Sequence, residues 1–357
     1  MATTLICDEQ RRVVPPMTGR QRFLAAARMR PVDTTPVWFM RQAGRSLPEY
    51  RALREQHDFM TVATTPELAA EATLMPVDRL GVDAAVLFAD IMLPLACLGI
   101  PFEIRQGIGP VIPDPIRSRA DVERLGFAPA AEATPYVIEA LQQLTGELGE
   151  RAALLGFAGA PFTLACYLIE GKPAREFPRA KSLMYGDPQT WHALMEALTR
   201  VTIDYLQSQV AAGADAVQLF DSWLGLLDPE TYETMALPYT RRIFAAVAPL
   251  APTIHFSTGT VALLEQLAGS GCTAVSVDWR QPLDVAWARL GPGVGIQGNL
   301  DPALVLAPWP AVERGARDVL RRAKGRAGHI FNLGHGILPQ TDPETLAGVV
   351  RVVHGEA

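Results

Sequence analysis

Short apolar runs recur along the chain, and most of them lack strict alternation of apolar and polar residues. Each run begins near a turn signal and ends in polar or glycine residues, a pattern typical of parallel strands buried on both faces. Eight such runs cover residues 37–40, 84–89, 153–158, 216–220, 253–256, 274–277, 294–297 and 330–333.

Helical patterns separate the apolar runs. The clearest covers residues 188–212, where Trp191, Leu194 and Leu198 begin one broad apolar face. Others cover residues 66–74, 135–148, 229–247, 260–268, 311–323 and 343–353. Several of them start with Thr or Asp followed by Pro, which favours the first helical turn.

Eight strands with intervening helices predict a single-domain (β/α)8 barrel of the TIM type over residues 19–357, with an active site at the carboxyl ends of the strands. A doubly wound open sheet is the alternative, although no GxGxxG follows the first strand. Residues 99–104 and 109–112 predict a hairpin inserted after the second strand. Residues 1–18 predict a flexible N-terminal extension.

Composition narrows the function classes. The chain has 357 residues, 49% of them hydrophobic, and a net charge of −6, without the basic excess of a nucleic-acid binder. No apolar run is long enough to span a membrane, and no signal peptide is expected. Four scattered cysteines (Cys7, Cys97, Cys166 and Cys272) form no CxxC pair, which predicts reduced thiols in a cytoplasmic protein.

The first apolar run delivers two arginines, Arg41 and Arg45, on either side of the small residues Ala43 and Gly44. Arginine presents a flat fork of donors that matches a carboxylate and keeps its charge. The pair indicates an anion-binding pocket at a strand end. Taken alone, these two residues fit a strand followed by a solvated basic turn slightly better.

Polar residues also follow other predicted strands, where a barrel would place its pocket. Asp90 follows the second strand, Ser222 the fourth and His335 the eighth, and Tyr167 lies a little beyond the third. Each could merely cap a turn or helix. Their joint placement at one end of the barrel favours a site.

Several motifs are similar to those of the uroporphyrinogen decarboxylase family. They are Arg41-Gln42-Ala43-Gly44-Arg45, Phe88-Ala89-Asp90-Ile91, the run from Gly156 to Leu164, Tyr167 with Glu170-Gly171, and Asn332-Leu333-Gly334-His335-Gly336. The resemblance runs from about Arg20 to the C-terminus. Leu224, where alanine is commoner in the family, is a small departure away from the expected chemistry.

The resemblance implies a carboxy-lyase that removes the carboxyl groups of the four acetate side chains of uroporphyrinogen III, giving coproporphyrinogen III in heme biosynthesis. It implies no metal, no organic cofactor and a homodimer. A pyrrole protonated on a ring carbon can accept the electrons that the departing CO₂ leaves behind, so the substrate itself does the work of a cofactor.

The resemblance also implies a role for each site residue. Asp90 would accept hydrogen bonds from the pyrrole N–H groups and stabilise the protonated pyrrole. Arg41 and Arg45 would bind carboxylates, and either Arg41 or a proton relay beside it would deliver protons. The other expected substrate contacts are the hydroxyl of Tyr167, the main chain around Gln42, Ala43 and Gly44, and the side chains of Ser222 and His335, while Phe59 and Phe88 could pack on the macrocycle or belong to the core.

Two other functions remain open from the sequence. A zinc-dependent, cobalamin-linked methyltransferase on a similar barrel would need thiolate ligands, but Ser257 follows His255 where a ligand cysteine would stand. A non-catalytic tetrapyrrole carrier would need the arginines and a cavity, but not the central Asp90.

Overall fold

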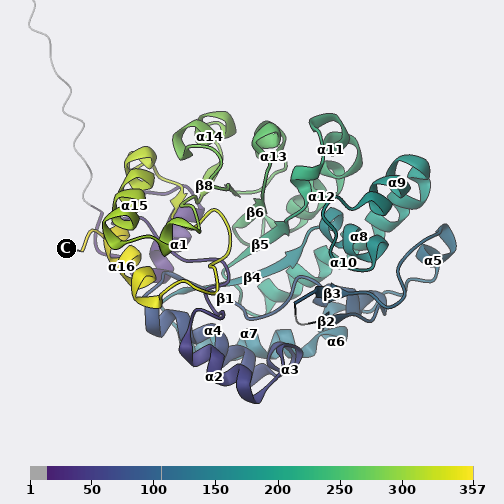
Figure 1. Ribbon diagram of the computed structural model, residues 1–357, viewed down its shortest axis with the longest axis horizontal. Coiled ribbons are helices and arrows are strands. Elements are labelled where there is room, and N and C mark those ends of the chain that lie inside the picture. The colour runs from purple at the N-terminus through teal and green to yellow at the C-terminus, as the bar shows by residue number, and fades with distance from the viewer. Residues whose placement is uncertain (1–13, 106, 357) are drawn as a thin grey trace, which may run out of the picture.

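A curled sheet of seven parallel strands forms the centre of the computed structural model, which describes residues 14–105 and 107–356 (Figure 1). The strands follow the order β1-β4-β5-β6-β7-β8-β9 around the sheet. They are β1 (Ala84–Val86), β4 (Ala153–Gly159), β5 (Ala216–Asp221), β6 (Thr253–Ser257), β7 (Ala274–Ser276), β8 (Gly295–Gln297) and β9 (His329–Ile330). The predicted α/β barrel architecture is confirmed, and seven of the eight predicted apolar runs overlap these strands.

The first predicted strand, residues 37–40, is reduced to a single bridge from Val37 to Phe331. On its other side, the Val37 carbonyl accepts a hydrogen bond from the backbone N–H of Asp83 at 2.8 Å. Val37 therefore closes the ring between β9 and β1. The extended backbone stops soon afterwards because Arg41 has a φ of 61°, in the left-handed region that does not continue a strand.

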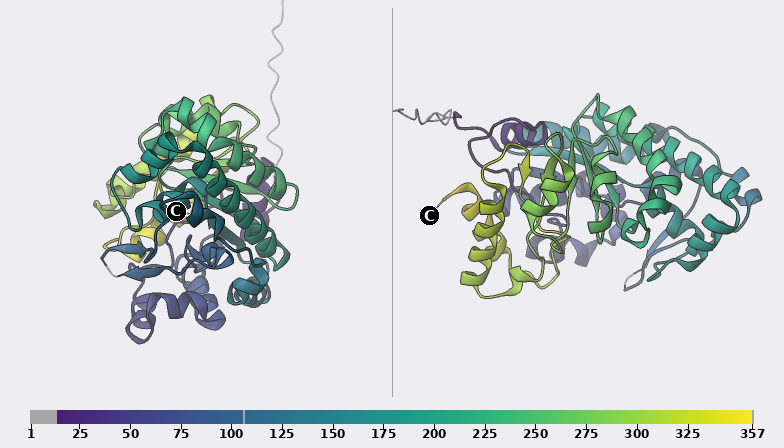
Figure 2. Two further views of the ribbon diagram at one scale, coloured as in Figure 1. Left: turned by 90° about the vertical axis from the view of Figure 1, so that its right-hand side faces the viewer. Right: turned by 90° about the horizontal axis from the view of Figure 1, so that it is seen from above.

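Sixteen α-helices surround the sheet within the described residues, and Figure 2 shows α15 and α16 at one end of the long axis and α9 toward the other. They are α1 (Gly19–Ala27), α2 (Pro48–Gln56), α3 (Phe59–Thr64), α4 (Pro66–Leu80), α5 (Arg119–Glu123), α6 (Ala130–Ala133), α7 (Pro135–Leu148), α8 (Pro161–Glu170), α9 (Pro178–Gly186), α10 (Pro188–Ala211), α11 (Pro229–Met235), α12 (Leu237–Val247), α13 (Leu264–Ala268), α14 (Leu283–Leu290), α15 (Trp309–Ala323) and α16 (Pro343–His354). Short 3-10 turns lie at Leu93–Leu98, Val261–Leu263, Leu224–Leu226 and Leu304–Leu306.

Three helix predictions were wrong in extent. The predicted helix 260–268 is α-helical only over α13, after the 3-10 turn Val261–Leu263. The predicted helix 229–247 is split into α11 and α12 at Ala236, where Pro238 lacks the N–H that a continuous helix would use. The predicted helix 66–74 continues to Leu80 as α4, through Pro76, and ends at Gly81 in the left-handed conformation. The predicted hairpin is confirmed as the antiparallel pair β2 (Glu103–Arg105) and β3 (Gly109–Val111).

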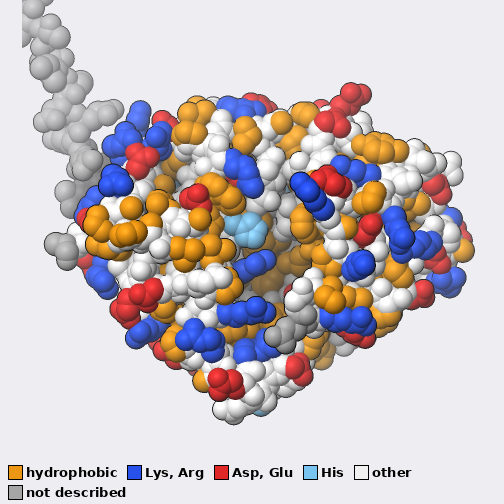
Figure 3. Space-filling model, in the orientation of Figure 1, with side chains coloured by type: hydrophobic (Ala, Val, Ile, Leu, Met, Phe, Trp, Pro, Cys, Tyr) orange, Lys and Arg blue, Asp and Glu red, His pale blue; other side chains and the backbone are white. Residues whose placement is uncertain are grey.

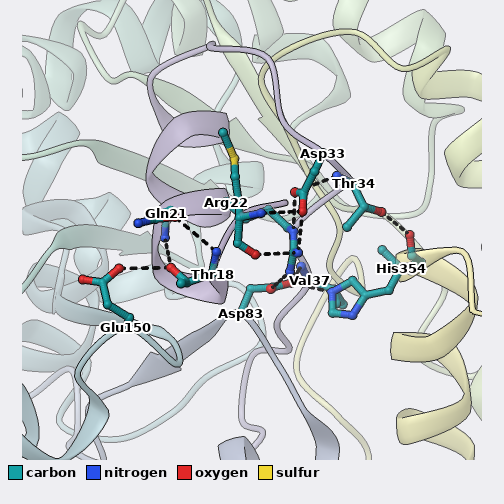
Figure 4. A network of polar contacts seen from close by, with 11 residues as sticks. Thr18, Gln21, Arg22, Asp33, Thr34, Val37, Asp83, Glu150 and His354 are labelled. Carbon is teal, nitrogen blue, oxygen red and sulfur yellow. Dashed lines mark hydrogen bonds and ion pairs between the residues drawn. The ribbon is translucent and has the colours of Figure 1, made fainter. Parts of the chain in front are cut away.

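Helix α1 covers the N-terminal end of the barrel, since it packs against β1, β4 and β9. A polar network fixes it there (Figure 4): Arg22 of α1 pairs with Asp83 at 2.7 Å and with Asp33 at 2.8 Å, and His354 of α16 reaches Asp83 at 2.8 Å. With this end covered, the carboxyl ends of the strands form the open end of the barrel.

The predicted N-terminal extension lies mostly outside the described residues. Met17 and Thr18 belong to the folded part, because the Met17 N–H donates to Asp33 and the Thr18 hydroxyl caps α1. Cys7 is also outside the described residues, whereas Cys97, Cys166 and Cys272 are buried and free, as predicted. No helix in the described part of the chain is long and apolar enough to cross a membrane.

Candidate active site

A cavity of about 550 Å³ opens at the carboxyl ends of the strands. In Figure 3, positively charged side chains and a histidine surround the hollow in this face. Of the residues that the sequence predicts for the site, all but Gln42 line the cavity: Arg41, Ala43, Gly44, Arg45, Asp90, Tyr167, Ser222 and His335. The fold therefore brings together side chains that are almost 300 positions apart in the sequence.

Arginines form one wall of this cavity. Arg41 and Arg45 are exposed at its mouth, and neither guanidinium has an ion-pair partner among residues 14–105 and 107–356. A third arginine, Arg54 of α2, lines the same wall and donates to the Tyr50 hydroxyl at 3.3 Å. Cationic groups without acidic partners in a cavity are suited to bind carboxylates. Arg54 was not predicted from the sequence, although its spacing of four from Tyr50 places both on one helix face.

Gln42 supports the cavity from behind. Its amide oxygen accepts from the Phe39 N–H at 3.0 Å, and its amide nitrogen donates to the Ala84 carbonyl at 2.9 Å. Its own N–H donates to the Phe39 carbonyl. Both the side chain and the main-chain N–H of Gln42 thus form hydrogen bonds within the barrel wall, where Gln42 supports the residues that line the cavity.

Asp90 lies half-buried in the cavity, four residues beyond the end of β1. Burial raises the pKa of Asp90 to about 6, against the opposing effects of a hydrogen bond from the Met92 N–H and the charge of Arg41. The Met92 N–H donates to Asp90 Oδ1 at 2.8 Å, which holds the carboxyl group in place. Asp90 is therefore an anion at neutral pH that its surroundings solvate poorly.

Tyr167 extends from α8 into the cavity. Its ring makes edge contacts with Phe177 and Trp223, at centroid distances of 5.8 and 6.1 Å. Burial raises the pKa of Tyr167 to about 12. The hydroxyl is consequently protonated at neutral pH and available as a donor.

His335 follows β9 and packs its ring edge-on against Phe256 at 5.8 Å. The Gly336 N–H donates to His335 Nδ1 at 2.7 Å, which assigns the proton of the neutral ring to Nε2. Burial, followed by the charge of Arg41, lowers the pKa of His335 to about 4. In this structure His335 is a neutral donor, and its ring is not expected to titrate near pH 7.

Aromatic rings line the cavity beside these polar groups. Three adjacent strands each contribute one phenylalanine: Phe157, Phe220 and Phe256. The ring centroids of Phe157 and Phe220 lie 5.3 Å apart, and those of Phe220 and Phe256 lie 5.2 Å apart. Phe59 and Phe88, which the sequence left undecided between cavity and core, both line the cavity and contact each other at 5.4 Å. Ile104 and Pro110 of the β2–β3 hairpin also line the cavity. The cavity combines aromatic surfaces with a cationic wall, as a large ring bearing several carboxylates would require.

The residues that the methyltransferase alternative would need for a thiolate metal site do not come together in the cavity. His255 is fully buried and packs against Phe244 of α12, outside the barrel interior. Across the described part of the chain, no group of three or more His, Cys, Asp or Glu residues is arranged to hold a metal ion.

Comparison with known proteins agrees with this arrangement. The family model described as uroporphyrinogen decarboxylase (URO-D) matches residues 18–356. The chain belongs to this family. It is 54% identical over 338 residues to a uroporphyrinogen decarboxylase of Streptomyces griseus, covering 94% of this chain and 92% of the relative. It is 52% identical over 334 residues to that of Thermobifida fusca, covering 93% and 92%.

Comparison with solved structures supports the barrel fold and nothing more. A methyltransferase from Methanosarcina mazei superposes with a TM-score of 0.79 at 21% identity, over 95% of this chain and 99% of that one. The relatives at about 50% identity support the decarboxylase interpretation and not the methyltransferase alternative.

Proposed function

We propose that this protein catalyses the decarboxylation of the four acetate side chains of uroporphyrinogen III, giving coproporphyrinogen III and four CO₂. The observation that carries the proposal is one cavity in which Asp90 lies among aromatic rings, with Arg41, Arg45 and Arg54 along the wall. Membership of the uroporphyrinogen decarboxylase family over residues 18–356 supports the assignment of the substrate.

Each decarboxylation needs a group that accepts the electrons of the breaking C–C bond and a group that stabilises the positive charge on the substrate. A proton added to the pyrrole ring carbon makes the ring cationic, and the electrons of the breaking C–C bond then flow into it as CO₂ leaves. The loss of CO₂ leaves an exocyclic methylene group on the ring. A second proton then adds to this methylene carbon, and the ring carbon loses the first proton. The net change converts each acetate and one proton into a methyl group and CO₂. Asp90 would stabilise the cationic ring, and a preorganised charge of this kind is commonly worth roughly 10²–10³ in rate.

The other site residues would bind and orient the macrocycle. Arg41, Arg45 and Arg54 would hold carboxylates at the rim, and the Tyr167 hydroxyl, the Ser222 side chain and the neutral Nε2–H of His335 would donate to others. Arginine is a weak acid, so a water or a substrate carboxyl group beside Arg41 is the alternative to Arg41 itself as proton donor.

Anaerobic incubation with reduced uroporphyrinogen III tests this proposal. Products with seven to four carboxylates are expected from the wild-type protein, separated after oxidation. The Asp90→Asn variant should fold and lose roughly 10²–10³ in rate at every step, because it keeps the shape but removes the charge. Near wild-type turnover by this variant would contradict the charge-stabilisation role, and wild-type protein that binds uroporphyrinogen without product would instead favour a carrier.

The proposal also includes that the protein is a homodimer and that it works in the cytoplasm. The family resemblance supports the dimer, and the three free buried cysteines fit a reducing compartment. Sedimentation equilibrium would distinguish a dimer from a monomer of 38.7 kDa.

A further inference from the structure

Arg41 is held in a conformation that its own residue type does not favour. Its φ of 61° lies in the left-handed region, where a β-carbon crowds the following carbonyl oxygen. Such conformations persist when the surrounding structure imposes them. The contacts around Arg41 therefore indicate what determines its position.

The segment after β9 holds the backbone directly before Arg41. The Met40 N–H donates to Asn332 Oδ1 at 3.2 Å, and the Met40 carbonyl accepts from the Ile337 N–H at 2.9 Å. Asn332 is fully buried. Both polar groups of Met40 are thus bonded to residues that flank His335, almost 300 positions further along the chain.

Gly336 lies against the stem of the Arg41 side chain. A β-carbon placed on Gly336 would come within 2.5 Å of Arg41 Cδ, 2.8 Å of Cγ and 3.1 Å of Nε. These are the three nearest heavy atoms, so the side chain of Arg41 is what a β-carbon on Gly336 would meet first. Real β-carbons do not approach other atoms this closely, and an alanine at this position would displace the arginine stem.

We infer that Gly336 is a positioning residue for Arg41: its lack of a side chain lets the arginine stem cross the turn after His335 and fixes the guanidinium in the cavity. The role of Arg41 in turnover rests on the proposed function. The packing of Gly336 against Arg41 does not depend on that function.

A double-mutant cycle tests the inference on the full chain. Gly336→Ala alone should lower kcat/KM for uroporphyrinogen by roughly 10- to 100-fold, since a displacement of about 1 Å in a binding group can cost this much. In an Arg41→Ala background the stem is absent, so adding Gly336→Ala should change kcat/KM by less than about twofold. Gly293→Ala, at an exposed glycine with no atom near its β-position, is the matched control and should match the wild type.

Equal losses from Gly336→Ala in both backgrounds, or no loss beside wild-type Arg41, would overturn the inference. The same cycle is measured with oxidised uroporphyrin, an octacarboxylate, as an equilibrium binding probe. Binding separates the two proposals: a wild type without decarboxylase activity would refute the proposed function, whereas coupling between Gly336 and Arg41 in the binding constants would still support the positioning role. Additive binding constants would refute the positioning role alone.

Discussion

Asp90 carries the negative charge that the proposed reaction needs, but its buried surroundings disfavour the charged form of the carboxyl group. Burial raises its pKa from 3.8 to about 6, although a backbone donor and Arg41 act in the other direction. A group placed in this way favours its neutral form in the folded protein. The charge that the proposed reaction needs at neutral pH is therefore held at a cost to folding.

The pH dependence of stability should expose this cost. A carboxyl group whose pKa is raised on folding contributes most below its unfolded value, near pH 4, and loses that contribution as the pH rises through 6. Two pKa units correspond to roughly 3 kcal/mol. Asp90→Asn should thus be more stable than the wild type at pH 8, by up to about 3 kcal/mol, with no difference near pH 4.

Urea unfolding at both pH values measures this difference. Asp114→Asn removes the same charge at an exposed position and should leave the free energy of unfolding within about 0.5 kcal/mol of the wild type at either pH. A constant difference between Asp90→Asn and the wild type from pH 4 to pH 8 would show that burial does not raise the pKa of Asp90.

At the scale of the elements, a side chain from α10 completes the hydrogen bonding of β4. The ladder between β1 and β4 ends near Leu155, so Phe157 has no strand on that side. The side-chain amide of Gln209 takes the place of the missing strand. Its oxygen accepts from the Phe157 N–H at 2.7 Å, and its nitrogen donates to the Phe157 carbonyl at 2.9 Å. Gly156 leaves room for this amide, since a β-carbon there would collide with it.

Gln209→Leu should destabilise the protein by about 2–4 kcal/mol, because it keeps the volume but leaves two buried backbone groups without partners. Urea unfolding provides the free energy. Gln189→Leu, at an exposed position of the same helix, should change it by less than about 0.5 kcal/mol. A loss of similar size in both variants would indicate a general effect of leucine in α10, not the bond to β4.

At the scale of the whole molecule, Asp83 closes the barrel. Val37 forms a single bridge, to Phe331, and the Asp83 carboxylate accepts from the Val37 N–H at 2.8 Å in place of a strand neighbour. The same carboxylate pairs with Arg22 of α1 and contacts His354 of α16. One side chain thereby joins the two ends of the described chain to the seam of the barrel.

Asp83→Ala should cost about 3–5 kcal/mol, because it leaves the buried Val37 N–H without an acceptor and takes a partner from Arg22. The measurement is urea unfolding of the full chain. Asp78→Ala is the matched control, since the Asp78–Arg151 ion pair is exposed and such pairs are worth less than about 1 kcal/mol. Equal effects of the two variants would mean that Asp83 does not secure the seam.

Local patterns explain why much of the fold could be predicted. The apolar run that becomes β4 and the helix starts at Asp187 and Asp342 express preferences that depend on a few adjacent residues. Val37 shows the limit: its neighbours are residues 83 and 331, and no periodicity reveals that it forms a bridge and not a strand.

The barrel class, the carboxyl-end location of the site and, through the motifs, the charged and polar groups expected in the cavity could be predicted from residue types and their spacing. The folded chain was needed to show that Gln42 faces the barrel wall, that Arg54 lines the cavity and that Gly336 packs on Arg41. The difference lies in the distance along the chain over which each property is set. Residue type and spacing set local conformation and chemistry, whereas direction, burial and the pKa values of Asp90 and His335 depend on atoms that the folded chain brings from far away.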